Sequence, residues 1–261
     1  MPEAPREKHA GPTLRLRGVG RRFGGLHAVR DVDIDVLPGE RRAILGPNGA
    51  GKTTLFNVIS GDLPPSAGTV ELLGHDVTHM PARRRAKLGL ARTYQQSHML
   101  NGLTVEDSIY LAILGTGDGH MRPFALPRRD GEIRERAREA ARLAAIEHKL
   151  KEPVGALSHG EHRQVAVAMA LASEPKMLIL DEPASGLSRG ERQLLTDLLL
   201  ELDRDITLLL IEHDMDVALR VAERVSMMHE GRVIVEGTPD EIRANELVHD
   251  LYLGRHHYAG E

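Results

Sequence analysis

The chain has 261 residues, of which 41% are apolar and 28% are charged, and its formal net charge is -4. Such a chain is long enough for one large domain or two small ones, and its slight negative charge excludes a general attraction to nucleic acid or anionic lipid. Cysteine is absent, which excludes disulfides and thiolate metal sites, and the longest apolar run, at 165–172, is far shorter than the ~20 residues of a membrane span.

The first half of the chain predicts short strands that lead to a glycine-rich loop. Residues 1–12 are polar and proline-rich, so we expect a flexible tail without the apolar core of a signal peptide. Apolar residues over 14–19 predict a first strand, and the strict alternation over 31–36 predicts a half-exposed antiparallel strand. Residues 43–45 predict a buried strand that runs into the loop, and residues 52–60 predict the helix that follows it.

The second half predicts a parallel sheet with helices between its strands. The continuous apolar runs at 176–181 and 207–212 are typical of parallel strands that are buried on both faces. Ser188 with Glu191 forms a capping box, and Thr238-Pro239 marks a further helix start. This alternation indicates an α/β fold with a mainly parallel sheet. By contrast, residues 104–172 show mostly helical patterning and predict a helical subdomain inserted into the α/β body.

The strongest motif is Gly46-Pro-Asn-Gly-Ala-Gly-Lys52-Thr53, which has the spacing of a phosphate-binding loop. Glycines let backbone N–H groups close around phosphate oxygens, and the following helix directs its positive end at them. Lys52 is expected to reach the β- and γ-phosphates, and Thr53 to offer its hydroxyl to Mg²⁺. The residues predicted to bind nucleotide here are Gly46, Pro47, Asn48, Gly49, Ala50, Gly51, Lys52, Thr53 and Thr54.

Two adjacent carboxylates follow one of the predicted buried strands, in Leu178-Ile-Leu-Asp181-Glu182. A carboxylate at the end of such a strand is well placed to hold Mg²⁺, which assigns Asp181 as a metal ligand. Glu182 beside it can orient or deprotonate an attacking water. The pattern is weak alone, because many apolar strands end in an acid, and it gains force from the phosphate loop upstream.

A third motif, Leu157-Ser158-His159-Gly160-Glu161, predicts a helix N-terminus. Ser158 and Glu161 fit a capping box, which is its structural interpretation. A capped helix start that contains glycine is also a good anion site, so Ser158, Gly160 and Glu161 are predicted to bind a nucleotide phosphate as well.

These three motifs, in this order and spacing, resemble the ATPases of ABC transporters, and the resemblance covers about 13–254. It implies roles for three further residues. Gln95 resembles the glutamine that contacts Mg²⁺ and the attacking water, and His213 resembles the switch histidine near the γ-phosphate. Phe23 resembles the aromatic residue that stacks on adenine. Glu182, His213 and Gln95 are therefore the expected catalytic residues.

A narrower resemblance is to the ATPases of branched-chain amino acid importers. It is carried by residues 22–28, 91–95, 211–215 and 252–254, and by the imidazole of His159 inside the third motif. Two positions depart from the general family pattern. Glu161 stands where glutamine is common, and Ser188 stands where the segment after Glu182 commonly ends in aspartate.

The resemblance implies a P-loop NTPase (RecA-like) core with a mainly parallel sheet, an antiparallel β subdomain and an inserted helical subdomain. The expected division is a tail at 1–12, an α/β body at 13–94 and 175–236, a helical subdomain at 95–174, C-terminal helices at 237–254 and a tail at 255–261. ATP and Mg²⁺ are the implied ligands. Each ATP is expected between the phosphate loop of one subunit and the third motif of a second ABC ATPase subunit.

The implied function is to power an importer for branched-chain amino acids or a similar small polar solute. The expected partners are transmembrane permease subunits and, indirectly, an extracytoplasmic solute-binding protein, with no nucleic acid. Such a subunit lies in the cytoplasm on the inner face of the cell membrane, and residues 97–110, with Met99, Leu100 and Leu103, are candidates for permease contact. Alternatives are a lipid-moving or other ABC transporter and a soluble ABC ATPase without a transport role.

Overall fold

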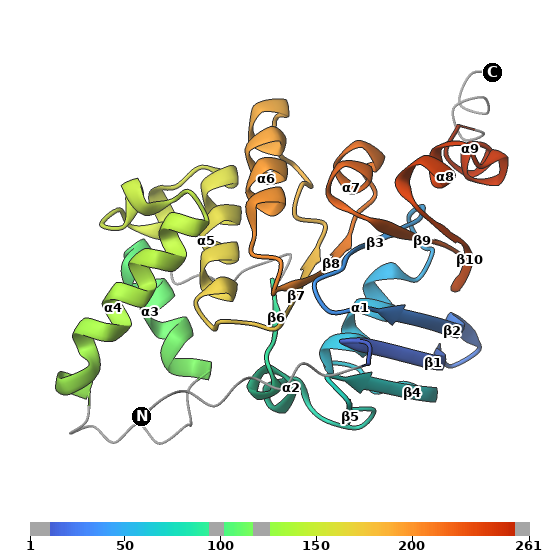
Figure 1. Ribbon diagram of the computed structural model, residues 1–261, viewed down its shortest axis with the longest axis horizontal. Coiled ribbons are helices and arrows are strands. Elements are labelled where there is room, and N and C mark those ends of the chain that lie inside the picture. Colours follow the sequence, from blue (N-terminus) through green and yellow to red (C-terminus); the bar gives the residue numbers. More distant parts are fainter. Residues whose placement is uncertain (1–10, 94–101, 117–125, 254–261) are drawn as a thin grey trace.

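The structure is a computed structural model that describes residues 11–93, 102–116 and 126–253. Figure 1 shows helices from the middle of the sequence, drawn in green to yellow, on the left, and two sheets to their right, with the antiparallel sheet below the larger one. The strands are β1 (Leu14–Phe23), β2 (Leu26–Val36), β3 (Arg41–Leu45), β4 (Ala67–Leu72), β5 (His75–Asp76), β6 (Leu90–Arg92), β7 (Met177–Asp181), β8 (Thr207–Ile211), β9 (Arg224–His229) and β10 (Arg232–Gly237). The helices are α1 (Lys52–Ser60), α2 (Ala82–Leu88), α3 (Val105–Thr116), α4 (Leu126–Leu143), α5 (His159–Leu171), α6 (Arg189–Glu201), α7 (Met215–Val221), α8 (Pro239–Arg243) and α9 (Glu246–Leu253).

The larger sheet has six strands in the order β10-β9-β3-β8-β7-β6. Its strands pair in parallel, except that β10 is antiparallel to β9. Every residue of β7 and β8 is buried, as the continuous apolar runs predicted, and so is every residue of β3, which begins at Arg41, before the predicted 43–45. Ile211 pairs with both Ile44 and Asp181, so the carboxyl ends of these three strands lie side by side. Ligand sites of open α/β sheets form at this edge.

The smaller sheet is antiparallel, with the order β2-β1-β4-β5. Its buried side chains, such as Leu14, Val32 and Ile34, alternate with exposed ones, as predicted for a half-exposed strand. They pack in one cluster with Phe56 of α1 and Ile179 of β7. Helix α1 therefore lies between the two sheets, which fixes the position of the loop that precedes it.

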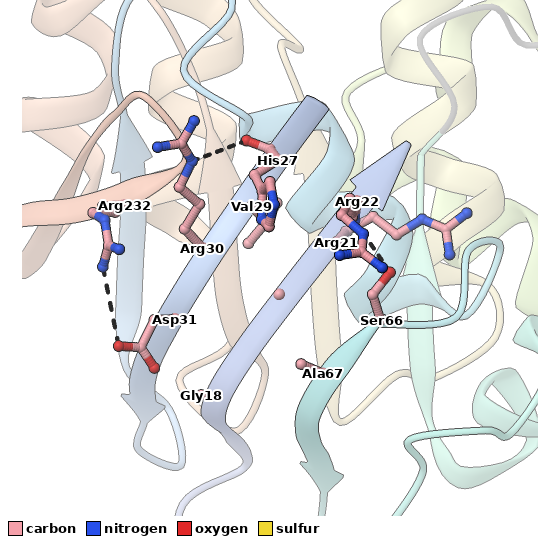
Figure 2. Close-up of a pocket in the computed structure, with 11 residues that line it drawn as sticks. Gly18, Arg21, Arg22, His27, Val29, Arg30, Asp31, Ser66, Ala67 and Arg232 are labelled. Atoms are coloured by element: carbon pink, nitrogen blue, oxygen red, sulfur yellow. Dashed lines mark hydrogen bonds and ion pairs between the residues drawn. The ribbon is translucent and has the colours of Figure 1, made fainter. Parts of the chain in front are cut away.

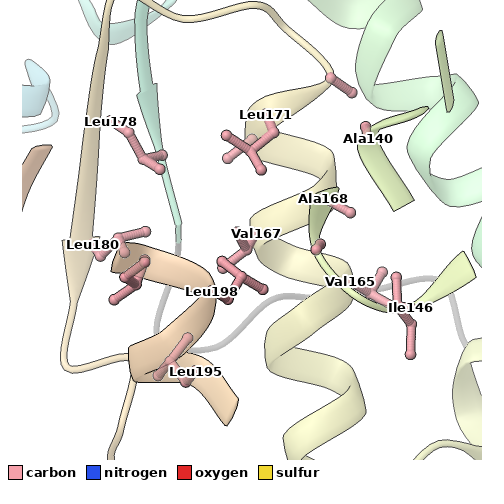
Figure 3. Close-up of a cluster of buried hydrophobic side chains, with 14 of the residues drawn as sticks. Ala140, Ile146, Val165, Val167, Ala168, Leu171, Leu178, Leu180, Leu195 and Leu198 are labelled. Atoms are coloured by element: carbon pink, nitrogen blue, oxygen red, sulfur yellow. The ribbon is translucent and has the colours of Figure 1, made fainter. Parts of the chain in front are cut away.

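Helices α3, α4 and α5 pack together and reach the larger sheet through α5. Figure 3 shows Val167 and Leu171 of α5 facing β7 and α6, while Ala168 and Val165 lie on the other side of the helix, toward Ala140 and Ile146. Fully burying a side chain such as Val167 contributes about 1.5–3 kcal/mol, so the face of α5 that carries it holds the helices on the sheet. The two sheets and the packed helices agree with the predicted α/β fold with an antiparallel sheet and a helical subdomain, and the domain boundaries stay a prediction. Among the described residues, no helix is long and apolar enough to cross a membrane.

Candidate nucleotide-binding and hydrolysis site

The phosphate loop joins the end of β3 to the start of α1. Gly51 has a φ of 99°, and a Cβ there would lie 2.2 Å from the carbonyl oxygen of Ala28, so only glycine fits. The ammonium of Lys52 is buried and donates hydrogen bonds to the carbonyl oxygens of Gly46 at 2.6 Å and Pro47 at 3.2 Å. The lysine thus lies back over its own loop, where its charge is available to an incoming phosphate.

A pocket of about 530 Å³ opens over this loop. Of the predicted nucleotide-binding residues, those from Asn48 to Thr54 line it, and Glu182 faces it from the end of β7. The full lining is Leu26, His27, Ala28, Arg30, Asn48, Gly49, Ala50, Gly51, Lys52, Thr53, Thr54, Glu182, Glu230 and Gly231. The structure therefore brings the phosphate loop and one predicted catalytic carboxylate to the same cavity.

Phe23 shortly precedes Leu26 and His27, which line this pocket, but it does not line the pocket itself. It pairs with Leu26 at the tip of the β1–β2 hairpin and is 44% exposed. The guanidinium of Arg21 lies 4.7 Å from its ring centroid. An exposed ring that holds a cation on one face is compatible with stacking of a base on the other.

Glu182 and His213 meet at the ends of β7 and β8. The Nδ1 atom of His213 lies 3.6 Å from Oε1 of Glu182. Glu182 has a φ of 46°, which is unusual for a residue other than glycine. Its N–H donates to the carbonyl oxygen of Ile211 at 2.8 Å, which holds this conformation. Strained backbone of this kind is concentrated at functional sites, and here it directs Glu182 into the pocket.

Asp181, the last residue of β7, is buried and fits a metal ligand. Its Oδ1 atom has no hydrogen-bond partner among the residues that the structure describes. Burial, and then the charge of Glu182, raise the pKa of Asp181 to about 6. A cation at Oδ1 would supply the missing partner and favour the ionised form. Asp181 and Thr53 would hold Mg²⁺, which supplies positive charge to the phosphate oxygens when it is bound.

The sequence patterns do not predict a role for one residue at this edge, Glu212, which ends the apolar run at 207–212. Its side chain is fully buried and accepts a hydrogen bond from the N–H of Ala184 at 2.9 Å. Burial raises the pKa of Glu212. A glutamate at the end of a continuous apolar strand was the available signal, because a buried carboxylate must be held by hydrogen bonds or cations.

Cationic and carboxylate side chains lie close together at this edge. Burial lowers the pKa of Lys52 and of Arg163. Attraction to the three carboxylates, Asp181, Glu182 and Glu212, acts in the opposite direction and favours the charged forms. The site therefore concentrates both signs of charge in a partly dry environment, where electrostatic effects on a phosphate are strong.

The third motif forms the start of α5, with the predicted capping box. Ser158 Oγ accepts from the N–H of Glu161, and Oε2 of Glu161 accepts from the N–H of Ser158 at 2.7 Å. This last bond lowers the pKa of Glu161. The N–H of Gly160 donates to Oε1 of Glu191 at 3.2 Å. None of Ser158, Gly160 and Glu161 is among the described residues that line the pocket over Lys52.

Gln95, Met99 and Leu100 lie outside the described residues. Leu103, the other apolar residue of the predicted permease contact, is half-buried beside α3. Its carbonyl oxygen accepts from the N–H of Val154. The contact to a permease stays a prediction.

A second pocket, of about 570 Å³, lies on the antiparallel sheet (Figure 2). Arg30 at its rim donates to the carbonyl oxygen of His27, and Arg232 lies 4.0 Å from Asp31. Because these arginines lie on an open strand surface and none of the predicted site residues line the pocket, we assign it no part in ATP hydrolysis.

Comparison with known proteins decides the family. The ABC transporter family model matches residues 29–185, which include the phosphate loop, the third motif and both carboxylates at the end of β7. The chain belongs to the ABC transporter ATPase family. Its residues 232–258 match a second model, the branched-chain amino acid ATP-binding cassette transporter. This cassette is 35% identical to the high-affinity branched-chain amino acid transport ATP-binding protein LivG of Escherichia coli strain K12, over 93% of this chain and 98% of LivG.

Other relatives agree with this placement of the cassette. The corresponding protein BraF of Pseudomonas aeruginosa is 32% identical over 93% of this chain and 98% of BraF. Among solved structures, the ADP conformation of an ABC transporter cassette matches with a TM-score of 0.81 and 30% identity, covering 93% of this chain and 99% of that one. A dimeric bacterial cassette matches with a TM-score of 0.75 and 26% identity, covering 87% and 98%. The predicted family, fold and ATPase activity are thus confirmed.

Proposed function

We propose that this cassette hydrolyses ATP to power an importer for branched-chain amino acids or a similar small polar solute. ATP hydrolysis is supported by one observation: Glu182, His213 and the phosphate loop lie together at one edge of the larger sheet. The observation that carries the solute class is the similarity to LivG and BraF over nearly the whole chain.

The reaction is the in-line attack of water on the γ-phosphate of ATP, which yields ADP and phosphate. The loop amides and Lys52 bind the phosphates and offset their charge, while Asp181 and Thr53 would hold Mg²⁺. Glu182 orients the water and accepts its proton, because its carboxylate faces the pocket. His213, whose Nδ1 atom lies 3.6 Å from Oε1 of Glu182, is the second side chain that we place beside the γ-phosphate. Gln95 is expected to be the third. Catalysis of this kind depends on position and charge, without a covalent intermediate.

The working unit is a head-to-tail dimer of ATPase subunits. The start of α5 lies outside the pocket over Lys52, so Ser158, Gly160 and Glu161 would serve the nucleotide of a second subunit. The similarity to a dimeric bacterial cassette supports this arrangement. The second subunit is a further copy of this chain or a related ATPase.

Outside this dimer, the partners are transmembrane permease subunits and, through them, an extracytoplasmic solute-binding protein. The cassette then lies on the cytoplasmic face of the membrane as a peripheral subunit, with residues 97–110 against the permease. One solved relative is described as part of an ABC transporter complex, which supports such an assembly.

The proposal is tested by capture of the tagged chain from native membranes in mild detergent, with identification of the proteins that accompany it. Two hydrophobic permeases and a second ATPase are expected, and vesicles that contain the complex should take up leucine in an ATP-dependent way. Uptake should disappear when E182Q replaces the native chain. Lipid movement without amino acid uptake, or soluble partners alone, would leave the ATPase assignment intact and overturn the transport assignment.

A further inference from the structure

Glu212 is a fully buried carboxylate at the point where β8 ends and the segment that carries His213 begins. Its side chain accepts three backbone hydrogen bonds. Oε1 accepts from Ala184, and Oε2 accepts from His213 at 3.2 Å and, more weakly, from Asp214 at 3.5 Å. Hydrogen bonds of this kind compensate the large cost of burying a charge.

These bonds join two segments that are far apart in sequence. Ala184 belongs to the turn that follows Glu182 and leads to the start of α6 at Arg189. His213 and Asp214 precede α7, and Asp214 is the N-cap of that helix. The two oxygens of one carboxylate therefore fix the turn after Glu182 and the turn that carries His213 at a constant separation.

The backbone of Glu212 adds a third link. Its N–H donates to the carbonyl oxygen of Ile44 at 3.2 Å, next to the end of β3. Since β3 leads into the phosphate loop, Glu212 touches all three segments that converge on the pocket. It does not line the pocket itself, so its influence on the reaction is indirect.

We infer that Glu212 is a positioning residue, which holds Glu182 and His213 in register with each other across the site where the γ-phosphate reacts. The inference rests on the roles proposed above for those two residues. A displacement of about 1 Å in a catalytic constellation can lower a rate by about 100-fold, so a residue that sets this register has a large effect without touching substrate.

The test is E212Q, which keeps the size of the side chain. Glutamine has one acceptor oxygen, so in either orientation of its amide an NH₂ group faces a backbone N–H that the carboxylate had bonded. We expect the kcat of E212Q to fall by at least ~10-fold, whereas KM and the affinity for a fluorescent ATP analogue change by less than ~3-fold. Amide hydrogen exchange should become faster in 183–187 and in 211–216 and stay unchanged over 46–54.

The matched control is E40Q. Glu40 is also buried, but it lies beside the start of β8, at the opposite end of the strand, and pairs with Arg42. E40Q should lower the melting temperature without lowering kcat, so a loss of kcat in E212Q alone cannot be ascribed to a weaker core. If E212Q does not fold, E212D takes its place. Its side chain is one methylene shorter, so it keeps the charge but cannot bond to both segments.

Two outcomes separate this inference from the proposed function. If E182Q is inactive while E212Q keeps its kcat and its slow exchange at 183–187, the positioning role is wrong and the catalytic role of Glu182 stands. If E182Q turns over normally, the proposed mechanism fails first and the positioning role fails with it.

Discussion

The carboxylate of Glu191 accepts a hydrogen bond from the backbone N–H of Gly160 at 3.2 Å, so a side chain from the start of α6 occupies the start of α5. Gly160 is buried under this contact, and a Cβ on it would lie 2.4 Å from Oε1 of Glu191. His159 strengthens the link, since its Nε2 lies 3.4 Å from the carbonyl oxygen of Ser185. In the isolated chain, the Glu191 carboxylate therefore accepts a hydrogen bond from the Gly160 N–H. This N–H is predicted to bind a phosphate of the nucleotide that the partner subunit holds.

We expect E191Q to promote the ATP-dependent dimer. Glutamine can keep the capping bonds to Ser188, but it removes a negative charge from the place where a triphosphate must approach. In a background of E182Q, which prevents hydrolysis, the ATP concentration for half-maximal dimerisation should fall roughly 2- to 5-fold. Size exclusion with light scattering measures this.

The control for that experiment is E201Q, which removes an exposed charge from the far end of the same helix. It should leave the ATP dependence of dimerisation unchanged. A dimer of E191Q that needs more ATP than the E182Q background would show that Glu191 supports the closed state instead of competing with phosphate.

Ser188, which departs from the common aspartate, is the N-cap of α6. Its Oγ accepts a hydrogen bond from the N–H of Glu191, and Oε2 of Glu191 accepts one from the N–H of Ser188 at 2.9 Å. Serine and aspartate are equally good N-caps, so the departure leaves the helix start intact. We expect S188A to lower the free energy of unfolding by about 1 kcal/mol and S188D to leave it within about 0.5 kcal/mol, as measured by urea denaturation. Equal stability of S188A and the native chain would contradict the capping role.

Much of the fold could be predicted because its signals are local in the sequence. The alternation around Val32 and Ile34 follows the two-residue period of a strand with one exposed face. The spacing from Gly46 to Thr53 is set by the geometry of a single loop, and the capping box from Ser158 to Glu161 spans one helical turn. Patterns of this kind need no knowledge of the tertiary structure.

The contacts that the sequence did not predict are between residues distant in the chain. Gly160 and Glu191 are 31 residues apart, and Ala184 and Glu212 are 28 apart. Each of these glutamates has an ordinary local interpretation, as a helix cap or as the end of a strand. Their further partners depend on how α5, α6 and β8 pack, and no local period encodes that.

Glu182 provides the direct test of the hydrolysis mechanism. We expect E182Q to bind ATP with native affinity and to lose turnover by about 100- to 10,000-fold, the usual contribution of a positioned base. The glutamine keeps the size of the side chain, so the loop around Lys52 stays intact. Phosphate release and nucleotide titration measure the two quantities. Normal turnover would remove Glu182 from its role.

Lys52 should behave differently, because we propose that its ammonium contacts the phosphates in both binding and reaction. K52A is expected to lose about 3 kcal/mol or more of transition-state stabilisation, as for the loss of one preorganised electrostatic group. ATP affinity should fall together with turnover, in contrast to E182Q. Near-native hydrolysis by K52A would contradict the assignment of the phosphate loop.

The proposed metal ligand Asp181 should lower the stability of the metal-free protein by an amount that depends on pH. Its pKa is raised from 3.8 to about 6 in the folded chain, so the folded state binds a proton more tightly than the unfolded state does. By linkage, the stability of the metal-free protein should decrease as pH rises from about 4 to about 6, and above that range the full penalty for an ionised, buried carboxylate applies. This rise in the pKa of Asp181 corresponds to at most ~3 kcal/mol.

We therefore expect D181N to be more stable than the native chain at pH 8 in the presence of a chelator, by about 1–3 kcal/mol. The advantage should shrink as the pH falls through about 6, because the native Asp181 then becomes protonated and loses its penalty. Urea denaturation at several pH values measures the difference, with D205N, an exposed aspartate, as the control that should show none. The same substitution should abolish Mg²⁺-dependent hydrolysis, because an amide is a poorer ligand for Mg²⁺ than a carboxylate. A D181N chain that is less stable than the native one at pH 8 would mean that the carboxylate is already satisfied in the folded state, and the case for a metal at Oδ1 would then fail.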